Sequence, residues 1–137
     1  MHLSAAGGTE EVDGAVNDME RILAALSAIR VPAQPEEYEI HAEIARALEA
    51  AGIEYIHEYR LGPRRRIDFL CGSIGIEVKK GKPDGARLRE QLSRYLENDR
   101  LSAAIVVLQR PCALPERICE KPVRVVALNR LWGVALP

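Results

Sequence analysis

Two short strand-like apolar segments, "RIDFLC" and "IGIEVK", are separated only by Gly72 and Ser73. A two-residue connection with glycine first is typical of a type II′ β-hairpin, in which the two strands run antiparallel. Because side chains alternate between the faces of a strand, this hairpin would place Asp68 directly opposite Glu77. The segment therefore predicts two adjacent strands with a pair of facing carboxylates.

Facing carboxylates need something to offset their repulsion. Directly opposed Cβ atoms lie about 4.5–5.5 Å apart, and like charges at such positions destabilise a sheet. A divalent cation removes this repulsion, and Mg²⁺ is commonly held by one or two carboxylates together with water and substrate phosphate. On the other face of the hairpin we expect a buried apolar layer, formed by Ile67, Phe69, Ile76 and Val78.

Lys79 lies two residues beyond Glu77 and therefore shares its face. An ammonium group in this position can stabilise a phosphoryl transition state or position the attacking water. An Asp, followed by Glu-x-Lys on the next strand, is the arrangement that metal-assisted phosphodiester hydrolysis requires. The alternative is a surface hairpin on which the two acids pair with Arg66, Lys79 or other nearby cations.

Hydrophobic periodicity predicts the other elements. Apolar residues recur at helical spacing in three segments, 10–30, 36–51 and 84–98, and the last begins at Asp84 as a predicted N-cap. Strand patterns occupy 53–61, 103–109 and 123–128, and 110–122 is a proline-bounded connection. This order predicts an α/β fold around one mixed sheet. We divide the chain into an N-terminal tail, amphipathic helix and linker (1–35) and one domain (36–137).

Length and cysteine content favour a single cytoplasmic domain. The chain has 137 residues, which suits one compact domain. Its three cysteines lack the spacing of a metal site, so we interpret them as reduced thiols, with Cys71 in a packing role. No apolar run reaches the length of a membrane span, and the N-terminus lacks a signal-peptide pattern, so we expect no membrane partner.

The net charge of −1 conceals an asymmetry along the chain. Residues 1–59 contain twelve acids and three Arg, whereas residues 60–137 contain sixteen Lys or Arg and eight acids. Such a distribution favours one surface that faces a polyanion, and the alternative is a set of solvated faces. The basic residues that we expect to contact nucleic-acid phosphates are Arg64, Arg65, Arg66, Lys80, Lys82 and Arg87.

Gln91 and Tyr95 are four residues apart in the predicted helix and therefore share one face. A glutamine can hydrogen-bond a ligating carboxylate or a water, and a tyrosine can donate to a phosphate or stack on a base. The alternative is that Tyr95 belongs to the core and Gln91 faces solvent.

Taken together, "RIDF", "IEVKKG" and "QLSRY" resemble the PD-(D/E)XK nuclease superfamily, and "QLSRY" is similar to the Gln-x-x-x-Tyr element of its RecB-like branch. The resemblance covers residues 36–128. Ile67 stands where the superfamily's name has Pro. The resemblance implies a restriction-endonuclease-like αβββαβ core, here with an extra N-terminal helix, and a small nuclease similar to Holliday-junction resolvases.

The same resemblance implies roles for particular residues. Asp68 and Glu77 would ligate Mg²⁺ or Mn²⁺, with the Val78 carbonyl as a further ligand. Lys79 would assist the attacking water, and Gln91 and Tyr95 would support the substrate or the metal. A further acid would come from the preceding helix.

For that helix acid we favour Glu39, with Glu43 as the alternative one turn later. Glu58 is a further candidate for a supporting acid. We expect His41 and His57 to have no metal role, because neither has ligand spacing to another histidine.

We therefore expect a Mg²⁺- or Mn²⁺-dependent nuclease that acts on nucleic acid, with DNA favoured. One alternative is a catalytically inactive module of this fold that binds nucleic acid or a protein partner. Another is an unrelated α/β assembly protein whose basic patch binds an acidic surface. The helix at 10–30 has few partners in so small a chain, so it either packs on the domain or pairs two protomers as a homodimer.

Overall fold

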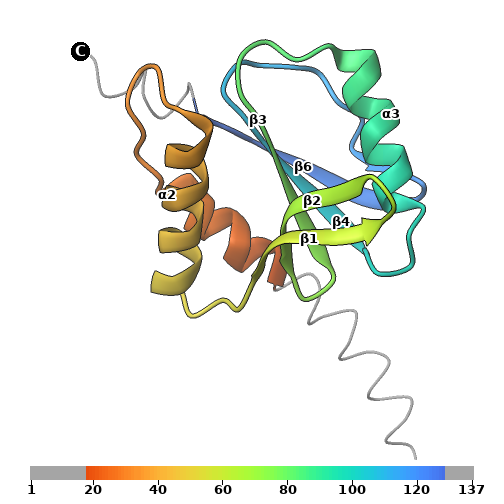
Figure 1. Cartoon of the computed structure of the whole chain (residues 1–137), viewed down its shortest axis with the longest axis horizontal. Helices are drawn as coiled ribbons and strands as arrows, with labels where there is room; N and C mark the ends of the chain where they lie inside the picture. Colours follow the sequence, from red (N-terminus) through yellow and green to blue (C-terminus); the bar gives the residue numbers. More distant parts are fainter. Residues whose placement is uncertain (1–17, 129–137) are drawn as a thin grey trace, which may run out of the picture.

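The computed structural model describes residues 18–128, which form a six-stranded mixed sheet with helices on both faces (Figure 1). The sheet order is β1-β2-β3-β4-β6-β5. A helix at 18–27 precedes the other elements, which are α2 (Glu37–Ala50), β1 (Ile56–Gly62), β2 (Arg65–Cys71), β3 (Ile74–Lys79), α3 (Gly85–Leu96), β4 (Ala103–Leu108), β5 (Arg117–Ile118) and β6 (Lys121–Ala127). The predicted α/β class with a mixed sheet is confirmed.

The hairpin of β2 and β3 has the predicted register. Cys71 pairs with Ile74, and the antiparallel ladder continues to Phe69 and Ile76. Gly72 has φ 62, which is the positive angle that the first turn residue of a type II′ hairpin needs. The ladder ends at the pair of Phe69 and Ile76. Asp68 and Glu77, the next residues away from the turn, are therefore not a ladder pair.

The remaining strands extend this hairpin into a mixed sheet. β1 adds antiparallel to β2, while β4 pairs parallel with β3 and β6 pairs parallel with β4. The parallel β3–β4 pair requires a crossover connection, and α3 supplies it. Asp84 caps α3 as predicted, by accepting hydrogen bonds from the backbone N–H groups of Ala86 and Arg87. β4 is buried along its whole length, as its continuous apolar run predicts.

The sheet separates two apolar layers. One layer joins the face of the sheet that carries Phe69 to α2 and to the first helix, whose buried residues include Ile22 and Leu26. This burial shows that the described part of the first helix packs on the domain. Cys71 is buried in the same layer. The other layer lies under α3 and includes Leu88, Leu92, Tyr95 and Leu96.

The side chains on either side of Asp68 do not lie on one face of the sheet, as had been predicted. Phe69 lies in the layer beside α2, but Ile67 lies in the layer beside α3, so the placement of Ile67 with Phe69 was wrong. On the neighbouring strand, Tyr59 packs against the α3 layer, whereas the His57 ring stacks on Phe69. Glu58, between them, has φ 58. This left-handed residue interrupts the regular alternation of side chains, and no glycine signals it in the sequence.

Gly75 allows a close approach between β3 and Ile67. A Cβ atom at this position would lie 2.3 Å from Ile67 Cδ1 and 3.3 Å from a Leu101 methyl. We expect Gly75→Ala to destabilise the protein by about 1–3 kcal/mol through overpacking. Ile67→Val, which removes Cδ1, should cost about 0.5–1.5 kcal/mol alone.

The double variant should be more stable than the sum of the two losses, by about 1 kcal/mol, because the clashing methyl is gone. Denaturant unfolding of the wild type, both single variants and the double variant measures this coupling. Additive losses would contradict the assigned contact.

Strand β5 was not predicted, because residues 110–122 indicated only a proline-bounded connection. Arg117–Ile118 turns back onto β6 through Cys119 and Glu120, at φ 53 and φ 60. Two consecutive left-handed residues form the tight hairpin turn, but the usual Asn-Gly signal is missing.

Within residues 18–128, no helix has both the length and the apolar character needed to cross a bilayer.

Candidate functional site

Asp68 and Glu77 come together where β2 and β3 diverge. Asp68 Oδ2 accepts a hydrogen bond of 2.8 Å from the Val78 backbone N–H, and the Asp68 N–H donates a long one of 3.4 Å to Glu77 Oε1. Each carboxylate thus accepts a hydrogen bond from a backbone N–H of the opposite strand. These two contacts join β2 and β3 beyond the end of their ladder. The predicted proximity of the two acids is present, through side-chain contacts rather than a regular cross-strand pair.

Both acids are held in surroundings that disfavour their charged forms. The Glu77 residue is only 4% exposed, and burial, with the nearby Asp68 charge, raises the pKa of Glu77 to about 8. Burial also raises the pKa of Asp68, although the Val78 N–H opposes that shift. A bound cation would relieve the cost of two ionised carboxylates here, so the donor set suits a divalent ion that prefers oxygen ligands.

Lys79 supplies positive charge at the end of β3. Its Nζ lies 3.4 Å from Glu77 Oε2, and its side chain is 32% exposed. The ammonium group can therefore contact both the buried carboxylate and a molecule bound at the surface. This placement agrees with the predicted common face of Glu77 and Lys79.

Gln91 and Tyr95 lie on one face of α3, as their spacing predicts. Gln91 Nε2 donates to the Tyr95 hydroxyl (2.9 Å), and that hydroxyl donates to the Arg66 carbonyl (3.1 Å). Tyr95 is 4% exposed, so the expected stacking of a base on its ring is not supported. Burial, together with the nearby Glu77 charge, raises its pKa, and the tyrosine therefore acts here as a neutral hydrogen-bonding group.

Three acids of α2 are candidates for the helix acid of this site, and their contacts differ. Glu39 Oε1 accepts from the Glu36 backbone N–H (2.8 Å) in a capping box, and Glu43 pairs with Arg46 (2.6 Å). Glu37 instead lies close enough for its charge to raise the pKa of Asp68. Glu37 is therefore a further candidate for the helix acid, beside Glu39 and Glu43.

The structure also gathers residues that the sequence left without a role. His41 is buried on α2, four residues after Glu37, and its Nε2 lies 3.8 Å from both Glu37 Oε2 and Asp68 Oδ2. His57 and Glu58 approach it from β1. The i, i+4 spacing of Glu37 and His41 was the available sequence signal, because such residues share a helix face.

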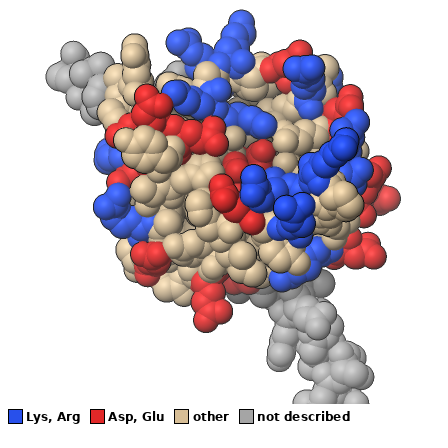
Figure 2. Space-filling view, in the orientation of Figure 1, with Lys and Arg blue, Asp and Glu red and all other residues tan. Residues whose placement is uncertain are grey.

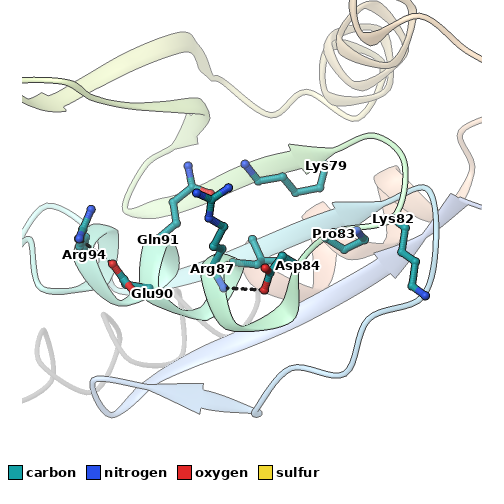
Figure 3. Close-up of a pocket in the computed structure, with 9 residues that line it drawn as sticks. Lys79, Lys82, Pro83, Asp84, Arg87, Glu90, Gln91 and Arg94 are labelled. Atoms are coloured by element: carbon teal, nitrogen blue, oxygen red, sulfur yellow. Dashed lines mark hydrogen bonds and ion pairs between the residues drawn. The ribbon is translucent and has the colours of Figure 1, made fainter.

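A cationic pocket adjoins Lys79. It has a volume of about 690 Å³, and Figure 3 shows Arg87 and Gln91 extending from α3 toward the side on which Lys79 lies. Lys82 and Arg94 also line it, although Arg94 is paired with Glu90 at 2.7 Å. Figure 2 shows Lys and Arg gathered on the part of this face where α3 and the preceding loop lie, with acids interspersed.

The other predicted basic residues lie outside this pocket. Arg64, Arg65 and Arg66 are exposed around the turn from β1 to β2, where Arg64 has φ 60. Lys80 is exposed, with its Nζ 3.8 Å from Glu36 Oε2. These cations remain accessible to a polyanion, and none of them lines the pocket with Lys82 and Arg87.

No protein-family model, curated protein or solved structure matches this chain. The chemistry of the site therefore follows from its own residues. These are a buried carboxylate pair, an adjacent ammonium group and an open cationic pocket, which together can bind a divalent cation and an anionic substrate.

Proposed function

We propose that this protein is a metal-dependent nuclease of the PD-(D/E)XK superfamily, and that it hydrolyses phosphodiester bonds in DNA. The observation that carries the proposal is the meeting of Asp68 and Glu77 at the divergence of two strands, with Lys79 Nζ 3.4 Å from Glu77 Oε2. A restriction-endonuclease-like core is compatible with the element order from α2 to β4 and with the parallel β3–β4 pair that α3 connects.

Asp68 and Glu77 would hold Mg²⁺ or Mn²⁺, and the Val78 carbonyl would contribute to the same site. The cation supplies positive charge that stabilises the phosphoryl transition state and favours ionisation of the attacking water. The Val78 N–H fixes the Asp68 carboxylate through Oδ2. Lys79 holds its ammonium group where it can orient the water or stabilise the scissile phosphate.

Phosphate binding would use the pocket beside Lys79. Lys82 and Arg87 line this pocket, and both present cationic groups of the kind that neutralise phosphates. Contacts of this type supply affinity and register but do not read base sequence. On these contacts the proposed nuclease would bind nucleic acid without reading its base sequence.

DNA binding is expected to weaken about 10- to 100-fold between about 50 and 200 mM salt, since counterions are released when cations contact phosphates. Arg87→Gln should lower the magnitude of the salt slope by about one. Arg46→Gln, on exposed α2 and paired with Glu43, should leave the slope unchanged. Fluorescence anisotropy with labelled duplex and branched DNA in EDTA measures these slopes, and a salt-independent affinity would contradict the proposed phosphate contacts.

Lys79 and its neighbour Lys80 allow a matched test of catalysis. Lys79→Gln should lower kcat by about 10²–10³-fold, because it removes a group that acts on transition-state charge. Lys80→Gln should mainly raise KM, because Lys80 lies outside the carboxylate site and would contact phosphate only. The assay follows cleavage of plasmid, linear and branched DNA with Mg²⁺, with Mn²⁺ and with EDTA.

Equal cleavage by wild type and Lys79→Gln would indicate a contaminating nuclease. DNA binding without cleavage in either metal would favour the inactive-module alternative. RNA cleaved in preference to DNA would retain the chemistry and change the substrate.

A further inference from the structure

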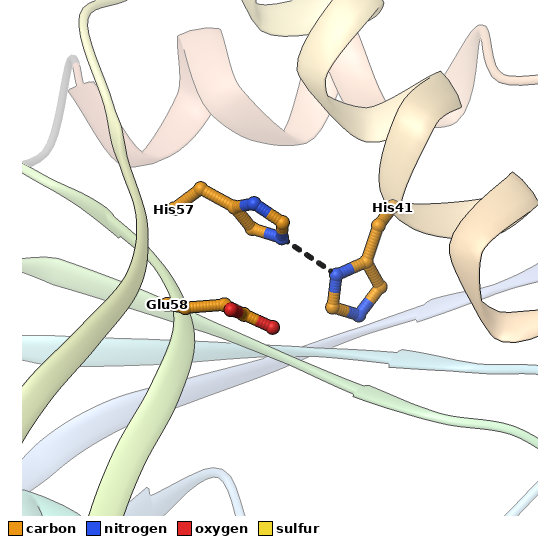
Figure 4. Close-up of side chains that lie close together, drawn as sticks. All are labelled: His41, His57 and Glu58. Carbon is orange, nitrogen blue, oxygen red and sulfur yellow. Dashed lines mark hydrogen bonds between the residues drawn. The ribbon is translucent and has the colours of Figure 1, made fainter.

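A second group of potential metal ligands lies between α2 and β1. His41 projects from α2, and His57 and Glu58 project from β1, with their side chains directed toward one another (Figure 4). One donor atom from each of the three lies within 4.8 Å of the others. We propose that these three residues bind a Zn²⁺-like transition-metal ion, with ligands distinct from the Asp68–Glu77 carboxylates.

An unusual backbone angle in β1 places His57 and Glu58 on the same side of the strand. Consecutive residues of a regular strand point to opposite faces, so His57 and Glu58 would normally diverge. Glu58 has φ 58, a left-handed angle that non-glycine residues seldom adopt and that often marks a functional constraint. This conformation brings the Glu58 carboxylate to the side occupied by the two imidazoles.

The two imidazole nitrogens lie at nearly the separation that a shared ion requires. His41 Nδ1 and His57 Nε2 are 2.8 Å apart and form a hydrogen bond. Tetrahedral zinc with Zn–N bonds of 2.0–2.1 Å would separate two such nitrogens by about 3.3 Å. The hydrogen bond would be replaced by two metal bonds if the nitrogens separated by a few tenths of an ångström, the rings turned both lone pairs toward the ion, and the bridging proton moved to the other nitrogen of its own ring.

The other nitrogen of His41 supports the same assignment. His41 Nε2 is buried without a hydrogen-bond partner among the described residues, and carboxylate oxygens of Glu37 and Asp68 lie 3.8 Å from it. Metal binding at Nδ1 places the ring proton on Nε2. Metal-bound histidines commonly donate this second N–H to a carboxylate, so Glu37 and Asp68 are suitable outer partners.

The donor set distinguishes this ion from the one proposed for the carboxylate pair. Imidazole suits zinc, copper, iron and nickel, whereas sites built of carboxylates and carbonyls suit Mg²⁺ and Mn²⁺. Two histidines and one glutamate are also the ligands of zinc sites that keep an open position. Here a pocket of about 420 Å³, lined by the three ligands and by Glu37 and Tyr38, leaves room for that position.

Zn²⁺ binding to the full chain tests the site without reference to cleavage. The measurements are competition against a chromophoric chelator and the visible absorption of bound Co²⁺. A Glu77→Gln background removes the carboxylate site, and one equivalent of Zn²⁺ should still bind. In that background, His57→Gln and Glu58→Gln should each weaken binding, His57→Gln by more than about 100-fold, which exceeds the loss typical of an outer partner.

Two further variants test whether other side chains of the protein supply the zinc ligands. His2→Ala removes the remaining histidine of the sequence, and Cys119→Ser removes an exposed thiol. Neither should change the stoichiometry or the Co²⁺ spectrum. The inference is overturned if Zn²⁺ fails to bind to the Glu77→Gln background, if binding survives His57→Gln and Glu58→Gln, or if Cys119→Ser abolishes it. Because activity is not measured, these outcomes leave the proposed nuclease function untouched.

Discussion

Glu77→Gln is expected to reduce DNA cleavage by about 10²–10³-fold or more, the loss that follows removal of one electrostatic group from an active site. The amide keeps the size and burial of the side chain but removes the charge that would bind Mg²⁺ or Mn²⁺. Glu77 lies 4% exposed between the Asp68 N–H and Lys79, so the substitution acts at the centre of the site. Mn²⁺ affinity should fall together with cleavage.

The same variant should fold at least as stably as the wild type in the absence of metal at pH 8. A buried glutamine carries no charge, and it therefore avoids the cost that raises the pKa of Glu77. Loss of function together with unchanged or increased stability is the pattern of a functional residue held at a structural cost. Isothermal titration with Mn²⁺, a cleavage assay and thermal unfolding in EDTA measure the three effects.

Glu97→Gln is the matched control, because Glu97 is an exposed acid at the end of α3. It should change neither metal affinity nor cleavage. If Glu77→Gln retained full cleavage and Mn²⁺ affinity, the carboxylate pair could not be the metal site. If it unfolded the protein, Glu77 would have a structural role through Lys79 and the Asp68 backbone.

The parts of the fold that follow from local chemistry could be predicted from the sequence. The Gly72–Ser73 turn sets the register of β2 and β3, because a two-residue hairpin allows few alternatives. Asp84 marks the start of α3 because its side chain can accept the free N–H groups of the first turn. The apolar run of β4 specifies burial on both faces.

The parts that depend on unusual backbone angles could not be predicted. Glu58, Cys119 and Glu120 all adopt positive φ without the glycine or asparagine that commonly marks such positions. Glu58 interrupts the alternation of side chains in β1 beside the point where Ile67 and Phe69 of β2 enter different layers, and the other two form the turn between β5 and β6. Propensity assigns these residues to ordinary strand or loop, so only the assembled sheet reveals them.

The choice of helix acid and the histidine cluster depended on tertiary packing. Glu37, Glu39 and Glu43 all lie on α2, and spacing alone does not say which side of the helix faces Asp68. The structure assigns Glu39 to the capping box and places Glu37 Oε2 and Asp68 Oδ2 each 3.8 Å from His41 Nε2. His57 reaches His41 across sixteen residues of sequence, a contact without a local signal.

Metal-free stability is expected to fall as the pH rises from about 4 to about 8. An unfolded glutamate ionises near pH 4.3, whereas burial, followed by the Asp68 charge, raises the folded pKa of Glu77 to about 8. In this window the folded protein holds a proton that the unfolded chain has lost, so each increase in pH favours unfolding. The raised pKa of Asp68 acts in the same direction. The combined loss is on the order of a few kcal/mol.

A divalent cation should reverse this trend. Because the ion requires ionised carboxylates, it competes with the proton strongly at pH 5.5 and much less at pH 8. The rise in Tm on adding Mn²⁺ should therefore be larger at pH 8 than at pH 5.5. Thermal unfolding of wild type and Glu77→Gln across this range, in EDTA and in Mn²⁺, isolates the glutamate from other titrating groups. Parallel pH profiles for the two proteins in EDTA would show that Glu77 ionises at its ordinary pKa, and burial of the carboxylate pair would then impose no free-energy cost for a cation to relieve.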